Sequence, residues 1–421
     1  MPITFGRFSD SFKPKYKIDC WNKCEKQFYD KQYADSYDSF FSYMTDDEVQ
    51  NLKFTRTGDN FEFEFPQGSK IIKGYVTNGK VEAESDIAEF EKPSVAVMRR
   101  LMEQNYSLFY SRFAFKDNRI VIRFDSSVAG GPPRKLYYAL KELASRADKE
   151  DDILKKDFSQ LKVTGSASVE DLPENEKEIK IRYFRKFIED MLKRISELNE
   201  EQFSGGISYL LLNTAYKIDY LIVPEGTLMN DLEKISFDYF AKDNKPFQEK
   251  NRVMKESLKK LLDMPKEDVM KAFYKTRSTF GIANPAPHQA VLDLFNNNIN
   301  NIKWYAENNY NDIAITIYEY LATFSLFSYG LPKPDAKLFH LMMNIINQEY
   351  FIELGVPEQY YDVPAGKFNE QLVKDKIDAI IKEGLELYPG LKFNTTNLKF
   401  ESMVSFLKTF IAEMQQLNYN S

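Results

Sequence analysis

The chain has 421 residues, more than the roughly 50–250 residues of a single domain, so its length predicts two or three domains. Hydrophobic residues make up 43% of the chain and aromatic residues 15%, which favours a well-packed globular protein over a disordered one. The net charge of −6 gives no general attraction to nucleic acid or to an anionic membrane, so we expect neither as a partner.

Apolar runs in this sequence are short. None reaches the roughly 18 residues that a membrane-spanning helix needs. The first twenty residues scatter Asp10, Lys13 and Lys15 among aromatic residues and contain no apolar core of the signal-peptide type. These features predict a cytoplasmic protein.

The two cysteines, Cys20 and Cys24, are the first candidate metal ligands. A helix would place them one turn apart on the same face, as a zinc pair requires. A structural zinc site usually takes four Cys or His ligands, however, and the two histidines, His288 and His340, are distant in the sequence. We therefore interpret the cysteines as two small buried thiols, and we expect neither a metal nor a cofactor.

The first 90 residues predict a helix followed by an antiparallel sheet. The helix, 19–44, carries an aromatic face that suits packing over a sheet, and the pair Asn78-Gly79 is typical of a hairpin turn. The predicted strands are 52–57, 60–65, 70–76 and 80–85. In the second strand Phe61, Phe63 and Phe65 alternate with Glu62 and Glu64, so we expect one face of the sheet to be buried and the other to face water.

Residues 94–149 predict a helix, a hairpin and a second helix. Ser94 begins a helix with Val95, Met98, Leu101 and Met102 at helical spacing. A strand over 108–115, with Phe109, Phe113 and Phe115 on one face, leads through the turn Asp117-Asn118 to a strand with Ile120, Ile122 and Phe124 on one face and Arg119 and Arg123 on the other. Gly130-Gly131-Pro132-Pro133 ends the strand before the closing helix. Residues 1–156 therefore predict an α+β domain, an antiparallel sheet with flanking helices.

This order of elements resembles the type III secretion chaperone-like fold, including the YbjN-type bacterial domains. The resemblance is closest in NYSLFYSRFAFKDNRIVIRFDSS (105–127) and in KLYYALKELASRADKEDDIL (135–154), where the stripe of the closing helix ends in Ala147-Asp148. It covers about the first 155 residues, and the chain differs by one additional strand before the middle helix and by its length. The resemblance implies binding of a partner's extended segment and allows a homodimer. It supplies no catalytic residues.

Residues 157–177 are small, polar and then acidic, which predicts a linker. From residue 178 onward the apolar spacing is helical, and prolines stand between the segments, so 178–421 predicts an all-α domain. Basic residues on the first helix could suit a membrane or a partner, but acidic residues dilute them, which favours an ordinary solvated face. The stretch from Ala306 to Leu321 resembles a tetratricopeptide junction without a second copy. The further predicted helices are 208–221, 228–240, 247–264, 266–278, 288–299, 301–307, 311–327, 335–354, 369–387 and 398–417.

Few residues in the sequence suit catalysis. Prolines follow Gly130-Gly131, and no lysine follows Gly205-Gly206 at the spacing of a phosphate-binding loop. Carboxylate pairs such as Asp46-Asp47 and Asp151-Asp152 fall in segments that look exposed. A cluster of His288, Asn284 and Tyr274 is the candidate for an active site, because histidine is the side chain suited to acid–base chemistry near neutral pH.

Two functional classes remain, a non-enzymatic protein-binding or chaperone-like protein and an enzyme with a dispersed site in the helical domain. We favour the first. Because the phenylalanine face is expected to be core, recognition is expected at the strand edges or on the outer face of the sheet, and the predicted partner-binding residues are Glu62, Glu64, Arg119 and Arg123. No catalytic residue is assigned.

Overall fold

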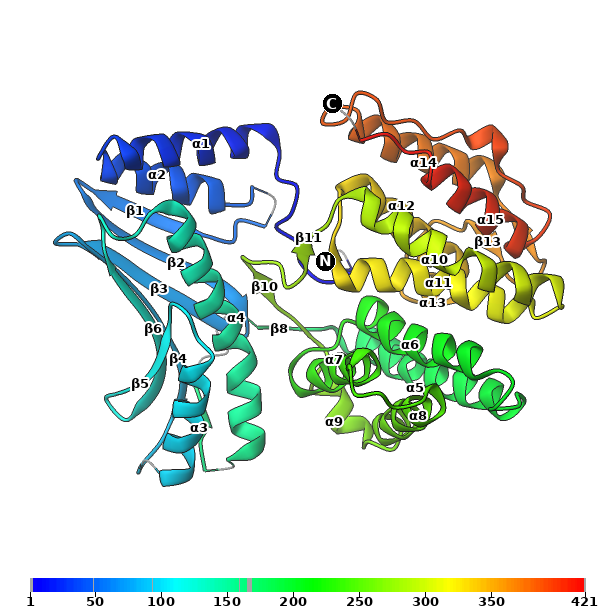
Figure 1. Cartoon of the computed structure of the whole chain (residues 1–421), viewed down its shortest axis with the longest axis horizontal. Helices are drawn as coiled ribbons and strands as arrows, with labels where there is room; N and C mark the ends of the chain where they lie inside the picture. The colour runs from blue at the N-terminus through cyan, green and yellow to red at the C-terminus, as the bar shows by residue number, and fades with distance from the viewer. Residues whose placement is uncertain (1–2, 48, 93, 159, 165–168, 420–421) are drawn as a thin grey trace. The chain divides into compact units, whose positions relative to one another are not determined.

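The computed structural model describes residues 3–47, 49–92, 94–158, 160–164 and 169–419, which form two compact units (Figure 1). We call Phe8–Asp171 with Tyr274–Ile282 the sheet unit, and Met1–Arg7, Leu172–Phe273 and Ala283–Ser421 the helical unit. The sheet unit contains an antiparallel sheet flanked by helices, and the rest of the chain is mostly helical, which confirms the predicted fold class. No helix in the described part of the chain is long and apolar enough to cross a membrane.

The sheet has the strand order β1-β2-β3-β4-β6-β5, and all its pairs are antiparallel. Its strands are β1 Lys53–Thr57, β2 Asn60–Gly68, β3 Lys70–Thr77, β4 Lys80–Glu89, β5 Arg112–Lys116 and β6 Arg119–Ser127. Its helices are α1 Lys15–Tyr29, α2 Tyr33–Met44, α3 Val95–Tyr106 and α4 Pro133–Asp157. Positive φ at Asn78, Gly79, Asp117 and Asn118 confirms both predicted two-residue turns.

One face of the sheet is buried under helices, as the alternation in β2 predicted. Phe61, Phe63 and Phe65 are buried in a core shared with α1, α2, α3 and α4. The Phe63 ring lies over Gly74 on β3, where a Cβ would come within 2.1 Å of the ring. Only glycine leaves room for this ring, so Gly74 is part of the core packing rather than a turn.

Two predicted elements of the sheet unit were wrong. The single helix over 19–44 is two helices, because Lys31 adopts a left-handed conformation (φ 62°) that ends α1, and neither Gly nor Pro marks the break. The strand predicted over 108–115 begins only at Arg112. Phe109 is 89% exposed whereas Phe113 is 5% exposed, so these side chains do not share a buried face.

Two helices that are apolar all round form the centre of the helical unit. In α6 and α11, which contact each other, most residues are buried, as expected for helices surrounded by others. Arg7 attaches the N-terminal segment to this unit through ion pairs with Asp219 (2.8 Å) and Glu225 (3.0 Å). The helices are α5 Glu174–Ser196, α6 Ser204–Leu221, α7 Gly226–Phe240, α8 Phe247–Leu262, α9 Lys266–Met270, α10 His288–Glu307, α11 Asn311–Ser328, α12 Lys333–Ile346, α13 Gln348–Glu353, α14 Glu370–Gly384, η1 Thr395–Asn397 and α15 Met403–Met414. Its short strand pairs are β11 Asn284–Pro285 with β12 Tyr329–Gly330, and β13 Tyr361–Asp362 with β14 Lys367–Phe368.

The prediction of a helix over 266–278 was wrong after residue 270, and the difference affects the fold. After α9 the chain forms β9 (Tyr274–Lys275) and β10 (Arg277–Ser278), and β10 pairs with the end of β2. The Gln67 side chain accepts hydrogen bonds from the backbone of Thr279 and Phe280, and Phe280 is buried in the core of the sheet unit. These long-range contacts override the local helical spacing.

Other helix boundaries also differ from the prediction. Residues 288–307 form one helix instead of two, 335–354 divides into α12 and α13, and α15 begins at Met403. The segment predicted as a linker, 157–177, contains β7 (Lys162–Val163), which pairs with β4, and β8 (Glu170–Asp171), which pairs with β9. Residues 165–168 in that segment lie outside the described residues, and the domain boundary stays a prediction.

Candidate functional site

The four residues predicted to bind a partner all lie on the outer face of the sheet, opposite the phenylalanine core. Register places Lys53, Glu64, Lys73, Glu84 and Arg123 in one row across β1, β2, β3, β4 and β6, so that charges alternate along the row. The neighbouring row contains Glu62, Tyr75, Glu82 and Asp125. Arg119 begins β6 at the other end, opposite Glu89. The structure therefore brings Glu64 and Arg123 into one row, with two strands between them.

Ion pairs fix much of this charge pattern. Arg119 pairs with Asp86 (2.6 Å), and Lys116 with Glu84 (2.5 Å). Arg112 donates a hydrogen bond to Asp125, which lowers the pKa of that carboxyl below its usual value. The longer pairs, Lys53–Glu64 at 3.7 Å and Arg123–Glu82 at 3.9 Å, are exposed and contribute little to stability.

The beginning of the edge strand β5 is protected against pairing with another strand. The Asn105 side chain, at the end of α3, accepts a hydrogen bond from the Phe113 N–H (2.7 Å) and donates one to the Phe113 carbonyl (3.1 Å). It thereby occupies the backbone groups of Phe113 that a further strand would use. The start of the β5 edge is thus a poor place for an added strand.

An apolar surface that the sequence did not predict lies beside this edge. We define the α3 surface as Val95, Arg99, Met102 and Tyr106, which recur along one side of α3, together with Phe109 just after it. All five are exposed, Tyr106 to 95% and Met102 to 73%, whereas Val97 and Leu101 on the other side of the helix are buried. The helix that Val95, Met98, Leu101 and Met102 predicted is present, but its apolar residues lie on two sides of α3.

Glu142 of α4 holds the exposed segment in place. It accepts hydrogen bonds from the backbone N–H groups of Phe109 (2.8 Å), Tyr110 (2.9 Å) and Ser111 (2.8 Å). Burial alone would raise the pKa of Glu142, but these donated bonds outweigh burial and lower the pKa. The segment that presents Phe109 is therefore an ordered part of the α3 surface.

His288 belongs to a buried cluster that differs from the predicted one. Its Nδ1 lies 2.9 Å from Asp335 Oδ2, and Tyr419 donates a hydrogen bond to Asp335 Oδ1 (2.8 Å). His288 is 7% exposed, and its Nε2 has no hydrogen-bond partner among the residues that the structure describes. Burial, and then Asp335, raise the pKa of Tyr419 far above its usual value. Asn284 begins β11, and Tyr274 belongs to the sheet unit.

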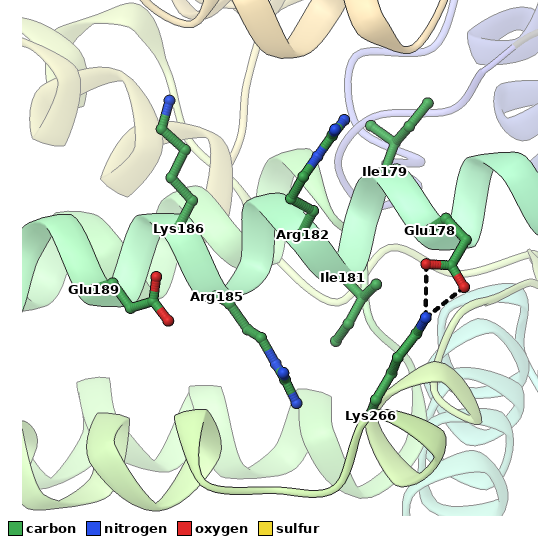
Figure 2. Close-up of a pocket in the computed structure, with 8 residues that line it drawn as sticks. All are labelled: Glu178, Ile179, Ile181, Arg182, Arg185, Lys186, Glu189 and Lys266. Carbon is green, nitrogen blue, oxygen red and sulfur yellow. Dashed lines mark hydrogen bonds and ion pairs between the residues drawn. The ribbon is translucent and has the colours of Figure 1, made fainter.

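The second histidine is a packing residue. His340 accepts or donates a hydrogen bond at 2.8 Å to the Tyr220 hydroxyl and contacts the rings of Phe5 and Phe351. Burial lowers the pKa of His340 to about 4, so the ring is neutral at physiological pH. Neither histidine lines the pocket beside α5 (Figure 2) or a second pocket at α8.

The cysteines lie on one helix, and one of the two carboxylate pairs lies where the side chains are described. Cys20 and Cys24 both lie on α1, Cys24 buried and Cys20 half-buried, and burial raises the pKa of Cys24 to about 11. Asp47 pairs with Lys17 (3.2 Å). The side chains of Asp151 and Asp152 lie outside the described part. Among the residues that the structure describes, no group of three or more His, Cys, Asp or Glu side chains could hold a metal ion.

Comparison of the chain with models of known protein families and with curated proteins found no match. The candidate function therefore has to come from the surfaces themselves.

Proposed function

We propose that this chain is a non-enzymatic protein-binding protein, and that the α3 surface is its principal contact. The observation that carries the proposal is the exposure of Met102 and Tyr106, one turn apart on α3, and of Phe109 in the ordered segment that follows. Exposed apolar side chains that gather in one place mark interaction sites in folded proteins. Tyrosine, methionine and phenylalanine are also the side chains that interfaces favour.

The size of the α3 surface suits the centre of an interface. Aromatic side chains bury roughly 150–250 Å² each, so Tyr106 and Phe109 together present roughly 300–500 Å², and Met102 adds to this area. A standard interface buries about 800 Å² on each partner. The α3 surface would supply most of this area, and the polar residues around it would form the rim.

The occupant we propose is a second copy of the chain. Two α3 helices packed antiparallel about a two-fold axis place Val95 of one copy against Tyr106 of the other, and Arg99 against Met102. Glu103, one turn after Arg99, then lies close to Arg99 of the second copy, so opposite charges meet at the centre. The resemblance to the chaperone-like fold also implies dimers.

The outer face of the sheet remains for a different protein in this proposal. Its row of Glu62, Glu82 and Asp125 around the exposed Tyr75 favours a partner segment that carries Lys or Arg, because such a segment complements the carboxylates and stacks on the tyrosine ring. Glu64 and Arg123 lie in the adjacent row, Arg119 lies further along β6, and these three side chains would set the register of the partner.

Sedimentation velocity on the full chain tests the proposal. Wild type should sediment with twice the mass of the chain, and Met102→Lys with Tyr106→Lys should shift it to the monomer, because one new ammonium group lies against Arg99 of the second copy and the other against the apolar Val95. Tyr29→Asp is the matched control, since Tyr29 is 74% exposed on α1, away from the α3 surface.

A wild-type monomer at every concentration would contradict the proposed dimer. An equal shift in the Tyr29 variant would show that the effect does not depend on the α3 surface. Circular dichroism on each variant establishes that the fold is retained.

A further inference from the structure

Residues 3–7, the N-terminal segment, contact the helical unit in the way that a bound peptide contacts its receptor. The segment belongs to the helical unit, whereas Phe8–Asp171 belongs to the sheet unit and the helical unit resumes only at Leu172. Its covalent link to the helices therefore passes through all of residues 8–171. The backbone of residues 3–7 is irregular, and each of these residues keeps part of its surface exposed. Contacts made by three consecutive residues, Phe5, Gly6 and Arg7, hold the segment in place.

Arg7 lies between two carboxylates near the C-terminal end of α6. Its guanidinium donates hydrogen bonds to Asp219 from Nε (3.2 Å) and from a terminal nitrogen (2.8 Å), donates to the Pro224 carbonyl, and pairs with Glu225 at 3.0 Å. Asp219 is 3% exposed, and a buried carboxylate without a cation is strongly unfavourable. This position therefore requires a positive charge, and the planar fork of arginine suits two carboxylates and a carbonyl at once.

Gly6 occupies a position that accepts glycine alone. Its N–H donates a hydrogen bond to the Tyr220 carbonyl at 2.8 Å, and its φ of 66° is the left-handed conformation that favours glycine. A Cβ at this position would come within 2.6 Å of the Tyr220 ring. Backbone conformation and space thus both select glycine.

Phe5 packs against aromatic rings of α12 and α13. Its ring stacks on Phe351, with centroids 4.7 Å apart, and lies 5.2 Å from the ring of His340. Phe351 is buried, and the low pKa of His340 keeps that ring neutral, so the contact is apolar. An aromatic side chain fits this position because ring pairs at these distances are favourable.

The loop that contacts Arg7 has a strained backbone. Val223 adopts a φ of 53°, which is an unfavourable conformation for a β-branched residue. The two residues that follow supply the Pro224 carbonyl and the Glu225 carboxylate to Arg7. Strain of this kind is common where a loop is shaped to hold a ligand.

We propose that these contacts form a docking site for an extended segment of a partner protein with the pattern aromatic-glycine-arginine, and that residues 3–7 occupy the site when no partner is bound. Asp219 and Glu225 select the arginine, the Tyr220 ring selects the glycine, and Phe351 selects the aromatic residue. The N-terminal segment then acts as a built-in competitor, because its attachment to the same chain gives it a high effective concentration. The site is independent of the α3 surface, and no covalent step is involved.

Fluorescence anisotropy with a labelled peptide of residues 3–8 tests this proposal on full-length proteins. The double variant Phe5→Ala with Arg7→Ala weakens the competing segment and leaves the docking site intact. The peptide should bind this variant at least about tenfold more tightly than it binds wild type. Peptides that carry Gly6→Ala or Arg7→Gln should bind the variant at least about tenfold more weakly than the unchanged peptide, because one clashes with the Tyr220 ring and the other lacks the charge-assisted hydrogen bonds.

One further substitution and a matched control locate the binding. Glu225→Gln, added to the double variant, should weaken peptide binding by about tenfold, because it removes a carboxylate partner of the arginine. Glu256→Gln removes a carboxylate from α8, where Glu256 pairs with Arg252 at 3.1 Å, and should leave the affinity unchanged. Thermal melts establish that each protein folds. If the double variant does not fold, Gly6→Ala in the full chain weakens the competing segment by a different route.

Three results contradict the proposal. Absence of peptide binding to the variants with a weakened segment would make residues 3–7 a fixed part of the fold. Equal affinity for wild type and the double variant would place the peptide on another surface. Equal binding of the unchanged and Gly6→Ala peptides would show that the site does not select the pattern.

Discussion

Single residues explain several features that periodicity does not predict. Asn105 covers the backbone of Phe113, Glu142 holds the segment before β5, and Gly74 leaves room for the Phe63 ring. Each of these contacts joins residues that are separated in the sequence, and the residue types involved do not stand out from their neighbours. No local pattern in one sequence identifies them.

His340 gives a prediction at this scale. Its pKa is about 4 in the folded chain and about 6.5 when unfolded, so between these values the unfolded state binds more protons. The free energy of unfolding is therefore fully retained above about pH 6.5 and falls, by roughly 1–3 kcal/mol, as the pH drops toward 4.

His340→Gln should remove this loss while keeping a hydrogen bond to Tyr220. The free energy of unfolding is measured by urea denaturation from about pH 7 to pH 4. Carboxylates contribute the same pH dependence to both proteins, so the difference between the two proteins reports on His340. If the free energy of unfolding depended on pH equally in wild type and variant, His340 would not titrate in this range.

At the scale of elements, strands were more predictable than helix surfaces. Alternation in β2 assigned Phe61, Phe63 and Phe65 to the core and the glutamates to the outer face, because a strand has two faces and only one was apolar. Apolar residues lie on two sides of α3. Packing selects Val97 and Leu101 for the core and leaves Met102 and Tyr106 exposed, which the sequence alone does not reveal.

The two faces of β2 provide a matched pair of variants. Phe63→Ala should destabilise the chain by roughly 3–5 kcal/mol, the cost of removing a buried aromatic ring. Glu62→Lys with Glu64→Lys should change stability by less than about 1 kcal/mol, because the Lys53–Glu64 pair is exposed.

Urea midpoints compare these two variants directly. An unchanged midpoint for Phe63→Ala would mean that the phenylalanine face is not the core. A large drop for the lysine variant would mean that the outer face contributes to the fold as well as to recognition.

At the scale of the whole molecule, the two fold classes were predictable, whereas the later segment that joins the sheet was not. Compositional change separates a strand-rich half from a helical half, and the structure has both. The sheet unit, however, takes residues 274–282 from the later half of the chain, where the local spacing resembles a helix. Pairing of β10 with β2 and burial of Phe280 decide their structure, and neither is visible before the fold is known.

This connection changes what a cut in the chain should do. A fragment ending at Thr164 lacks β10 and Phe280, so we expect it to be less stable than the same unit in the full chain by roughly 3–5 kcal/mol, the cost of a lost aromatic core residue. Adding a peptide of residues 274–282 should raise its melting temperature, whereas the peptide with Phe280→Ala should not. A fragment as stable without the peptide as with it would show that β10 is dispensable.

The central claim, that the α3 surface binds a second copy of the chain, is tested most directly by cysteine cross-linking. In a background of Cys20→Ser and Cys24→Ala, Met102→Cys lies near the proposed two-fold axis, whereas Tyr29→Cys lies on α1, outside the surface. Mild oxidation should link the Met102→Cys chains into disulfide-bonded dimers and leave the Tyr29→Cys chains as monomers. Equal cross-linking at both positions, or none at Met102→Cys, would contradict the account.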